Sequence, residues 1–140
     1  MPQTGATPIA RQFIQAWNAG QRDVVDDLAA PNLTVAYPHF PEPLEGPDAF
    51  KEMLGQTHHF FPDLTIEVDA VLAEGHQAAV HWRYQGTFQN GEMFGVEAAG
   101  QSVEVTGLTR YRIADGTVQE ERGVVDNFGL MMQLGATPEG

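Results

Sequence analysis

The chain has no cysteine, one serine (Ser102) and one lysine (Lys51) among its 140 residues. The lack of cysteine excludes disulfides and thiolate metal sites, and it makes a reducing, cytoplasmic location the expected one. Mechanisms that need a Cys or Ser nucleophile, or a lysine that forms a Schiff base, therefore have almost no candidate residues. If the protein is an enzyme, we expect its chemistry to depend on proton transfer by Asp, Glu, His, Tyr and Arg.

Basic residues are also scarce, since seven Lys and Arg against nineteen Asp and Glu give a formal net charge of −12. Phosphate backbones and anionic membrane surfaces need clustered cations, so we expect neither nucleic acid nor a membrane as a partner. No apolar run approaches the roughly 20 residues that span a bilayer. The first residues lack the basic and apolar regions of a secretory signal.

What is present fits a single α+β domain over residues 1–140, with residues 1–6 and 136–140 expected to be flexible. Helical spacing and end signals predict helices over 7–20, 23–28 and 47–61, the first capped by Thr7. Alternation and turn signals predict strands over 32–37, 64–72, 78–88, 103–113 and 118–125. Residues 89–102 are predicted to be a Gly-rich loop.

Three stretches, in this order, carry a family resemblance: FFPDLTIEVDAVLAEGHQAAVHWRYQGTF, FGVEAAGQSVEVTGLTRYRIADGTVQEE and VVDNFGLMMQLG. Together they resemble the SnoaL-like polyketide cyclases, which belong to the NTF2-like superfamily. The resemblance spans nearly the whole chain. It implies a cone, in which a curved, largely antiparallel sheet wraps around a cavity and three N-terminal helices close it.

The resemblance also implies an activity, because characterised cyclases of this family close a polyketide ring by aldol addition without a metal or an organic cofactor. Their key Asp lies on the last strand, and it maps onto Asp126. The cyclases also use a His in the C-terminal part of the sheet, whereas this sequence has no His after His81. Arg122 stands where the family usually has an aromatic residue.

Asp126 has two interpretations from the residues alone. It closes the apolar stretch GVVD and precedes the apolar segment NFGLMMQLG. A buried carboxylate there would have a raised pKa and could act as an acid/base group. The same residue could instead cap the terminal helix. Asn127 could equally be that cap, which would leave Asp126 facing the cavity.

Two further candidates lie on predicted strands. Arg122 shares one face of its strand with Val118 and Asp126 if side chains alternate regularly. It could bind a substrate oxygen, or it could pair with a neighbouring glutamate on the exposed side. His81 lies on a polar face opposite an apolar face that includes Trp82, and the sequence leaves open which of the two lines the interior.

The other candidate substrate-binding residues are Trp17, Tyr37, His39 and His58. His58 falls on the apolar side of its helix, so it either contacts the cavity or is a core histidine with its hydrogen bonds satisfied. The adjacent His59 points elsewhere, so the two make a poor chelating pair, and no metal is expected. Tyr37 and His39 flank a Pro-rich loop that could form the mouth of a pocket. Trp17 is expected in the core or the cavity wall.

Two functions are compatible with these features. The first is a cofactor-independent acid/base enzyme that acts on a small apolar cyclic or polyketide-like molecule by aldol cyclisation, isomerisation or hydrolysis. The second is a non-catalytic carrier or sensor of hydrophobic ligands. A homodimer that packs sheet against sheet is also expected, since the strand face with Val103, Val105, Tyr111 and Ile113 needs cover.

Overall fold

The computed structural model describes residues 5–136. The helical segments are α1 Ala6–Phe13, the 3₁₀ turn η1 Ile14–Trp17, α2 Val24–Leu28, α3 Pro47–Phe60 and α4 Asn127–Leu134. The strands are β1 Ala29–Ala36, β2 Leu44–Glu45, β3 Thr65–Glu74, β4 Gln77–Phe88, β5 Glu92–Met93, β6 Val96–Glu97, β7 Gln101–Ala114 and β8 Thr117–Val125. The flexibility expected at the two ends concerns mainly residues outside the described part, and Ala6 and Ala136 inside it are buried.

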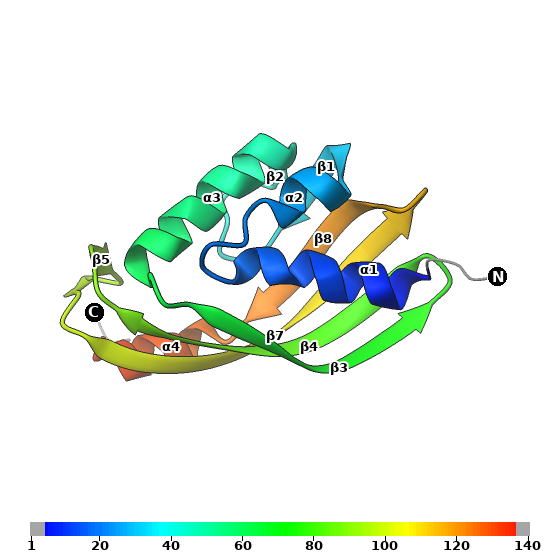
Figure 1. Cartoon of the computed structure of the whole chain (residues 1–140). Helices are drawn as coiled ribbons and strands as arrows, with labels where there is room; N and C mark the ends of the chain where they lie inside the picture. The colour runs from blue at the N-terminus through cyan, green and yellow to red at the C-terminus, as the bar shows by residue number, and fades with distance from the viewer. Residues whose placement is uncertain (1–4, 137–140) are drawn as a thin grey trace.

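Six strands form one curved sheet in the order β2-β1-β8-β7-β4-β3, and β5 and β6 form a separate hairpin. Every neighbouring pair in the large sheet is antiparallel except β1 with β8. Helices α1, α2 and α3 lie over one face of this sheet, and α4 packs at the N-terminal end of β7 (Figure 1). The predicted α+β class with a largely antiparallel curved sheet is confirmed.

The alternation of β7 sorts its side chains between the two faces of the sheet. Val103, Val105, Tyr111 and Ile113 are at most 5% exposed, because they pack in the core. The chain's own core therefore covers these four side chains, so they give no reason for a second subunit, and the expected homodimer stays a prediction. The outward side chains of β7 are polar except for Leu108, which is 47% exposed.

The same alternation decides the orientation of β4. Val80, Trp82 and Phe88 are buried, whereas His81 is exposed. The apolar face therefore lines the interior and the polar face lies outside. His81 does not reach the inside of the cone.

Two element predictions need correction. The first helix begins at Ala6 with Gly5 before it, so Thr7 is not its cap, and the helix tightens into η1 before Asn18. The predicted loop over residues 89–102 contains the short hairpin of β5 and β6. Helix α3 begins at Pro47 as predicted, since the fixed φ of proline suits the first helical position.

Candidate functional site

A small cavity of about 140 Å³ lies inside the cone, under the β5–β6 hairpin. The sheet contributes Tyr84 and Val125, and α4 contributes Asn127 and Leu130. The remaining wall residues come from η1, α3, the loops beside them and the hairpin: Trp17, Tyr37, His39, Phe40, Met53, Thr57, Phe60, Phe61, Met93 and Phe94. The wall is thus mainly apolar and aromatic, with a few polar groups, as small-molecule sites commonly are.

A buried carboxylate, Glu121 on β8, lies directly behind two of these wall residues. The Tyr37 hydroxyl donates to Glu121 Oε2 at 2.6 Å, and the Trp17 indole nitrogen donates to the same oxygen at 3.2 Å. The Glu121 side chain is fully buried. Only the side chains of Tyr37 and Trp17 therefore separate this carboxylate from the cavity. The sequence did not point to Glu121 as a candidate.

Burial raises the pKa of Glu121 from 4.5 to about 7, and the hydrogen bonds from Tyr37 and Trp17 oppose that shift only in part. The pKa of Tyr37 is raised well above 10, first by its own burial and then by the charge of Glu121. The phenol is therefore neutral at physiological pH. The carboxyl group, in contrast, exchanges its proton near neutrality.

The hydrogen bonds around Glu121 have a defined direction. The Trp82 indole nitrogen can only donate, and it donates to Thr109 Oγ1 at 2.9 Å. The Thr109 hydroxyl lies 3.0 Å from the Tyr37 hydroxyl. When Glu121 is ionised, the donors therefore run in series from Trp82 through Thr109 and Tyr37 to the carboxylate.

Two atoms beside this network have no hydrogen-bond partner within the described residues: Glu121 Oε1 and the Tyr111 hydroxyl. Burial raises the pKa of Tyr111 well above its usual value, and the charge of Glu121 adds to this shift. An ionised carboxylate with one unpartnered oxygen is costly in a buried site, which agrees with the raised pKa of Glu121.

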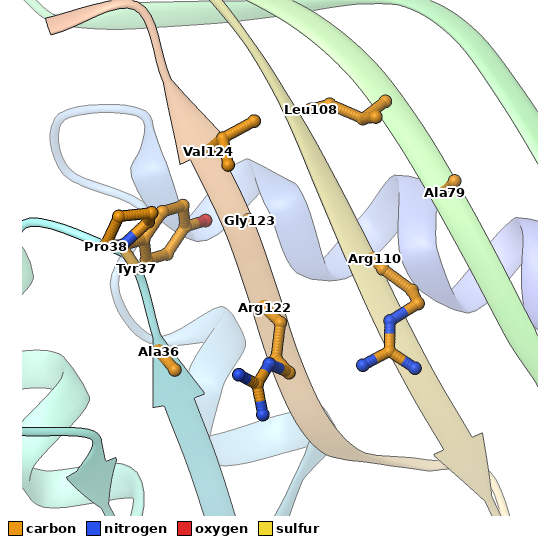
Figure 2. A pocket seen from close by; sticks show the side chains of 9 residues that line it. All are labelled: Ala36, Tyr37, Pro38, Ala79, Leu108, Arg110, Arg122, Gly123 and Val124. Carbon is orange, nitrogen blue, oxygen red and sulfur yellow. The ribbon is translucent and has the colours of Figure 1, made fainter.

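Gly123 makes this arrangement of Tyr37 possible. A Cβ at this position would lie 2.7 Å from the Leu108 carbonyl oxygen, from Thr109 Oγ1 and from the Tyr37 ring. Figure 2 shows the Tyr37 ring beside Gly123. The absence of a side chain therefore lets Tyr37 lie against the sheet and reach Glu121.

We expect Gly123→Ala to destabilise the fold by about 1–3 kcal/mol, since a methyl group would be forced against backbone and a buried ring. Urea denaturation measures the change in the free energy of unfolding. Gly86→Ala is the matched control in the same sheet, because its Cβ would meet its nearest neighbours at 3.3 Å. Equal losses of stability in the two variants would contradict this explanation.

The expectation that Asp126 faces the cavity is wrong. Asp126 is exposed, it is the N-cap of α4, and its Oδ1 accepts a hydrogen bond from the Gly129 backbone nitrogen at 2.9 Å. Asn127, which was the alternative cap, lines the cavity instead. The first backbone N–H groups of a helix have no partner within the helix, so the Asp126 carboxylate turns towards them and accepts a hydrogen bond there.

Trp17 and Tyr37 line the cavity, whereas His58 is partly buried and is not among the wall residues. The His58 ring nitrogen Nε2 lies 2.8 Å from the Trp17 carbonyl oxygen, and burial lowers the pKa of His58. This histidine therefore contacts the end of η1 rather than the cavity. Trp17 and Tyr37 are both cavity wall and hydrogen-bond donors to Glu121.

His39 lies at the mouth of the cavity. Its ring is 5.9 Å from the Tyr37 ring and 4.8 Å from the Phe40 ring, measured between centroids. Partial burial lowers the pKa of His39, so its imidazole is neutral at physiological pH and can accept a proton. Both Tyr37 and His39 line the cavity, but only His39 is exposed, whereas Tyr37 is buried.

Arg122 and His81 lie on the outer face of the sheet. Arg122 is exposed and its guanidinium is 3.7 Å from Glu120, which is the pairing that the sequence left as an alternative. A shallow groove of about 560 Å³ lies beside it, and Figure 2 shows Arg110, Arg122, Leu108 and Val124 along this groove. The groove is larger than the inner cavity, and Tyr37 lines both of them. The other aromatic wall residues, His39 and Asn127 line the inner cavity and not the groove, so we place the candidate site inside.

Within residues 5–136, no group of three or more His, Asp or Glu side chains is placed to hold a metal ion. No helix in the same part of the chain is long and apolar enough to cross a membrane.

A family model described as SnoaL-like polyketide cyclase matches residues 7–134, which is most of the chain. The chain belongs to this family. The resemblance stated from the motifs is thereby confirmed. Among curated proteins, no sequence matches the chain.

Solved structures agree with the SnoaL-like assignment. A protein from Jannaschia sp. CCS1, assigned as a SnoaL-like polyketide cyclase, is 26% identical over 99% of both chains, with a TM-score of 0.80. IdmH from Streptomyces antibioticus, assigned as a polyketide cyclase, is 25% identical over 95% of this chain and 100% of its own, with a TM-score of 0.82. AclR from Streptomyces galilaeus, assigned as a hydroxylase, shares the fold at 23% identity over 95% and 97% of the two chains, with a TM-score of 0.82.

A more distant structure, from Catenulispora acidiphila, is described as ketosteroid isomerase-like in fold and is 12% identical, with a TM-score of 0.77 over 92% and 93% of the two chains. The NTF2-like cone expected for this SnoaL-like chain is therefore confirmed. The buried carboxylate of this member comes from Glu121, whereas the position matched to the family's Asp is a surface helix cap.

Proposed function

We propose that this SnoaL-like protein is a cofactor-independent acid/base enzyme that enolises a small apolar ketone in the inner cavity. One observation carries the proposal. A fully buried carboxyl group with a pKa near neutrality is hydrogen-bonded to Tyr37 and Trp17, and both side chains form the cavity wall. Aldol ring closure, isomerisation and related hydrolysis all begin when such a group activates the carbonyl of the substrate.

The positions of the protons in this hydrogen-bond network suggest a role for each residue. When Glu121 is protonated, it donates to Tyr37, and the hydroxyl hydrogen of Tyr37 is then available to a substrate oxygen. Tyr37 stabilises the enolate oxygen that forms or transfers its proton to it, and Glu121 replaces that proton. His39, neutral at the cavity mouth, removes the proton from the carbon beside the carbonyl. The reaction returns both protons in reverse order.

Hydrogen–deuterium exchange tests this proposal directly. Cyclohexanone in D₂O should take up deuterium at its α-carbons faster with the protein than in buffer of the same pH, as followed by proton NMR. The His39→Gln variant should lose most of this acceleration while keeping its fold. Exchange no faster than in buffer, with binding retained, would contradict the enzyme and leave a carrier.

The carrier is the second candidate function, and two observations favour it. The cavity wall is mainly aromatic and aliphatic, and Asp126 lies on the surface as a helix cap. A carrier would bind apolar molecules by burial alone. It would hold them equally well with or without the Tyr37 hydroxyl, so binding and exchange measured on the same variants separate the two functions.

We also propose that two copies of the chain pair through the outer face of the sheet. At one end of this face Arg110, Arg112 and Arg122 share the single carboxylate of Glu120. At the other end Glu67, Asp69 and Glu104 share the single guanidinium of Arg83. Along β7, Leu108 lies between the two ends. A two-fold axis that crosses β7 at Leu108 would place each basic end on the partner's acidic end.

Such pairing makes a clear prediction for the oligomeric state. The protein should sediment as a dimer at micromolar concentration, and Leu108→Glu should make it a monomer because a charge would be buried at the centre of the contact. Gln56→Glu is the control, since it adds the same charge at an exposed position of α3, which covers the other face of the sheet. A monomeric wild-type protein in light scattering would overturn the pairing.

A further inference from the structure

The size of the inner cavity restricts which ketone the proposed enzyme can take. Its volume is about 140 Å³, whereas sites for drug-sized ligands usually measure roughly 300–1,000 Å³. A dry apolar cavity of about 150 Å³ holds one benzene molecule. The space under the hairpin therefore matches one six-membered ring and not a fused polycyclic system.

The cover of the cavity is fastened, so the space is preformed. The segment that leads into the hairpin is held to the end of α3 by two hydrogen bonds: the Gln89 nitrogen donates to the Phe60 carbonyl at 2.9 Å, and the Asn90 side chain donates to the His59 carbonyl at 2.7 Å. Gly100 closes the other side by donating to the Phe88 carbonyl at 2.9 Å. These bonds keep the hairpin against Phe60.

Phe94 at the tip of this hairpin is a cavity wall residue in an unusual conformation. Its φ is 53°, in the left-handed region that non-glycine residues seldom adopt, and its side chain is 47% exposed. Because Phe94 lines the cavity and is also about half exposed, its ring lies at the boundary between the cavity and solvent. Removing this ring should therefore enlarge the space open to a ligand.

The cavity wall offers a ligand a few polar groups within apolar surface. Tyr37, Trp17 and Asn127 provide polar groups, whereas Phe60, Phe61 and Leu130 provide apolar surface. From this geometry we infer that the substrate is a single-ring or similarly small molecule with one ketone oxygen, held with the oxygen at Tyr37 and its carbon skeleton against the phenylalanines. This inference rests on the proposed function for the chemistry, and on the cavity alone for the size.

Ligand-observed NMR with cyclohexanone, 2-tetralone and anthrone tests the size limit, because these ketones have one, two and three rings. The wild-type protein should bind cyclohexanone at millimolar concentration and bind anthrone at least tenfold more weakly. Phe94→Gly should admit 2-tetralone with a gain of at least tenfold, since it removes the ring and relieves the positive φ together. Phe128→Ala, an exposed residue outside the cavity, is the control and should change neither affinity.

The outcomes separate this inference from the proposed function. Binding of anthrone as tight as that of cyclohexanone, or no gain for 2-tetralone in Phe94→Gly, would overturn the size limit. Failure of all three ketones to bind would overturn it as well. Binding of cyclohexanone without α-proton exchange would instead sustain the size limit and contradict the enzyme.

Discussion

Tyr37→Phe is expected to lower turnover of an enolisable ketone by ~10²–10³-fold, the usual effect of removing one donor to a developing oxyanion. The variant keeps the aromatic ring in the cavity wall and loses only the hydroxyl that bonds Glu121 at 2.6 Å. Because the donor acts most strongly on the enolate oxygen, kcat should fall more than KM rises. Initial rates of α-proton exchange at several ketone concentrations measure the two constants.

Two controls define what this result means. Tyr111→Phe removes another buried hydroxyl, one with no hydrogen-bond partner among the described residues, and should leave turnover within a fewfold. Asp126→Asn should be nearly neutral in both stability and turnover, since Asn caps a helix about as well as Asp. Loss of turnover in Asp126→Asn with full turnover in Tyr37→Phe would return the catalytic assignment to Asp126.

The second large effect is on stability. Folding raises the pKa of Glu121 from 4.5 to about 7, so between these values the unfolded chain has lost a proton that the folded chain keeps. Stability then falls as pH rises through this window, by about 1.4 kcal/mol per pH unit and about 3 kcal/mol in total. The penalty is absent below pH 4.5 and fully present above pH 7. Glu121→Gln, which cannot ionise, should not show it.

The measurement is the free energy of unfolding of both proteins from pH 4.5 to pH 8. The difference between them should shift by about 3 kcal/mol in favour of Glu121→Gln at the alkaline end. Taking the difference removes the opposite trend from His39 and His58, whose lowered pKa values make the fold more stable as pH rises. A difference that stays constant across this range would show that Glu121 titrates normally in the folded protein.

The fold was predictable from the sequence because its signals are local and repeated. The strands β4 and β7 alternate over many residues, and Pro47 fixes the start of α3. The start of α1 was not predictable in this way, because Thr7 has the chemistry of a cap but the helix already begins at Ala6. A capping preference of about 1 kcal/mol is easily outweighed by packing of the apolar face.

The site was predictable only in part, and the reason lies in β8. Regular alternation would place Val118, Arg122 and Asp126 on one face, but Val118 is buried while Arg122 and Asp126 are exposed. The pairing with β7 shifts between Arg112 and Ile113, so Gln119 is an extra residue and the parity of the strand changes after it. Tyr37 and Trp17 were identified, whereas Glu121, Thr109 and Trp82 were missed. The adjacent pair Glu120 and Glu121 was an available signal, since one of two neighbouring strand residues must point inward.

The bulge at Gln119 has a consequence for how sequences in this family diverge. A single inserted or deleted codon in this strand would turn Glu120 inward and Glu121 outward. Gly123 and Val125 would turn outward together with Glu121. A member of the family can therefore acquire or lose an interior carboxylate without any change of amino-acid type. Positions in relatives should accordingly be matched across β8 by the direction in which each side chain points, and not by counting back from the C-terminal helix.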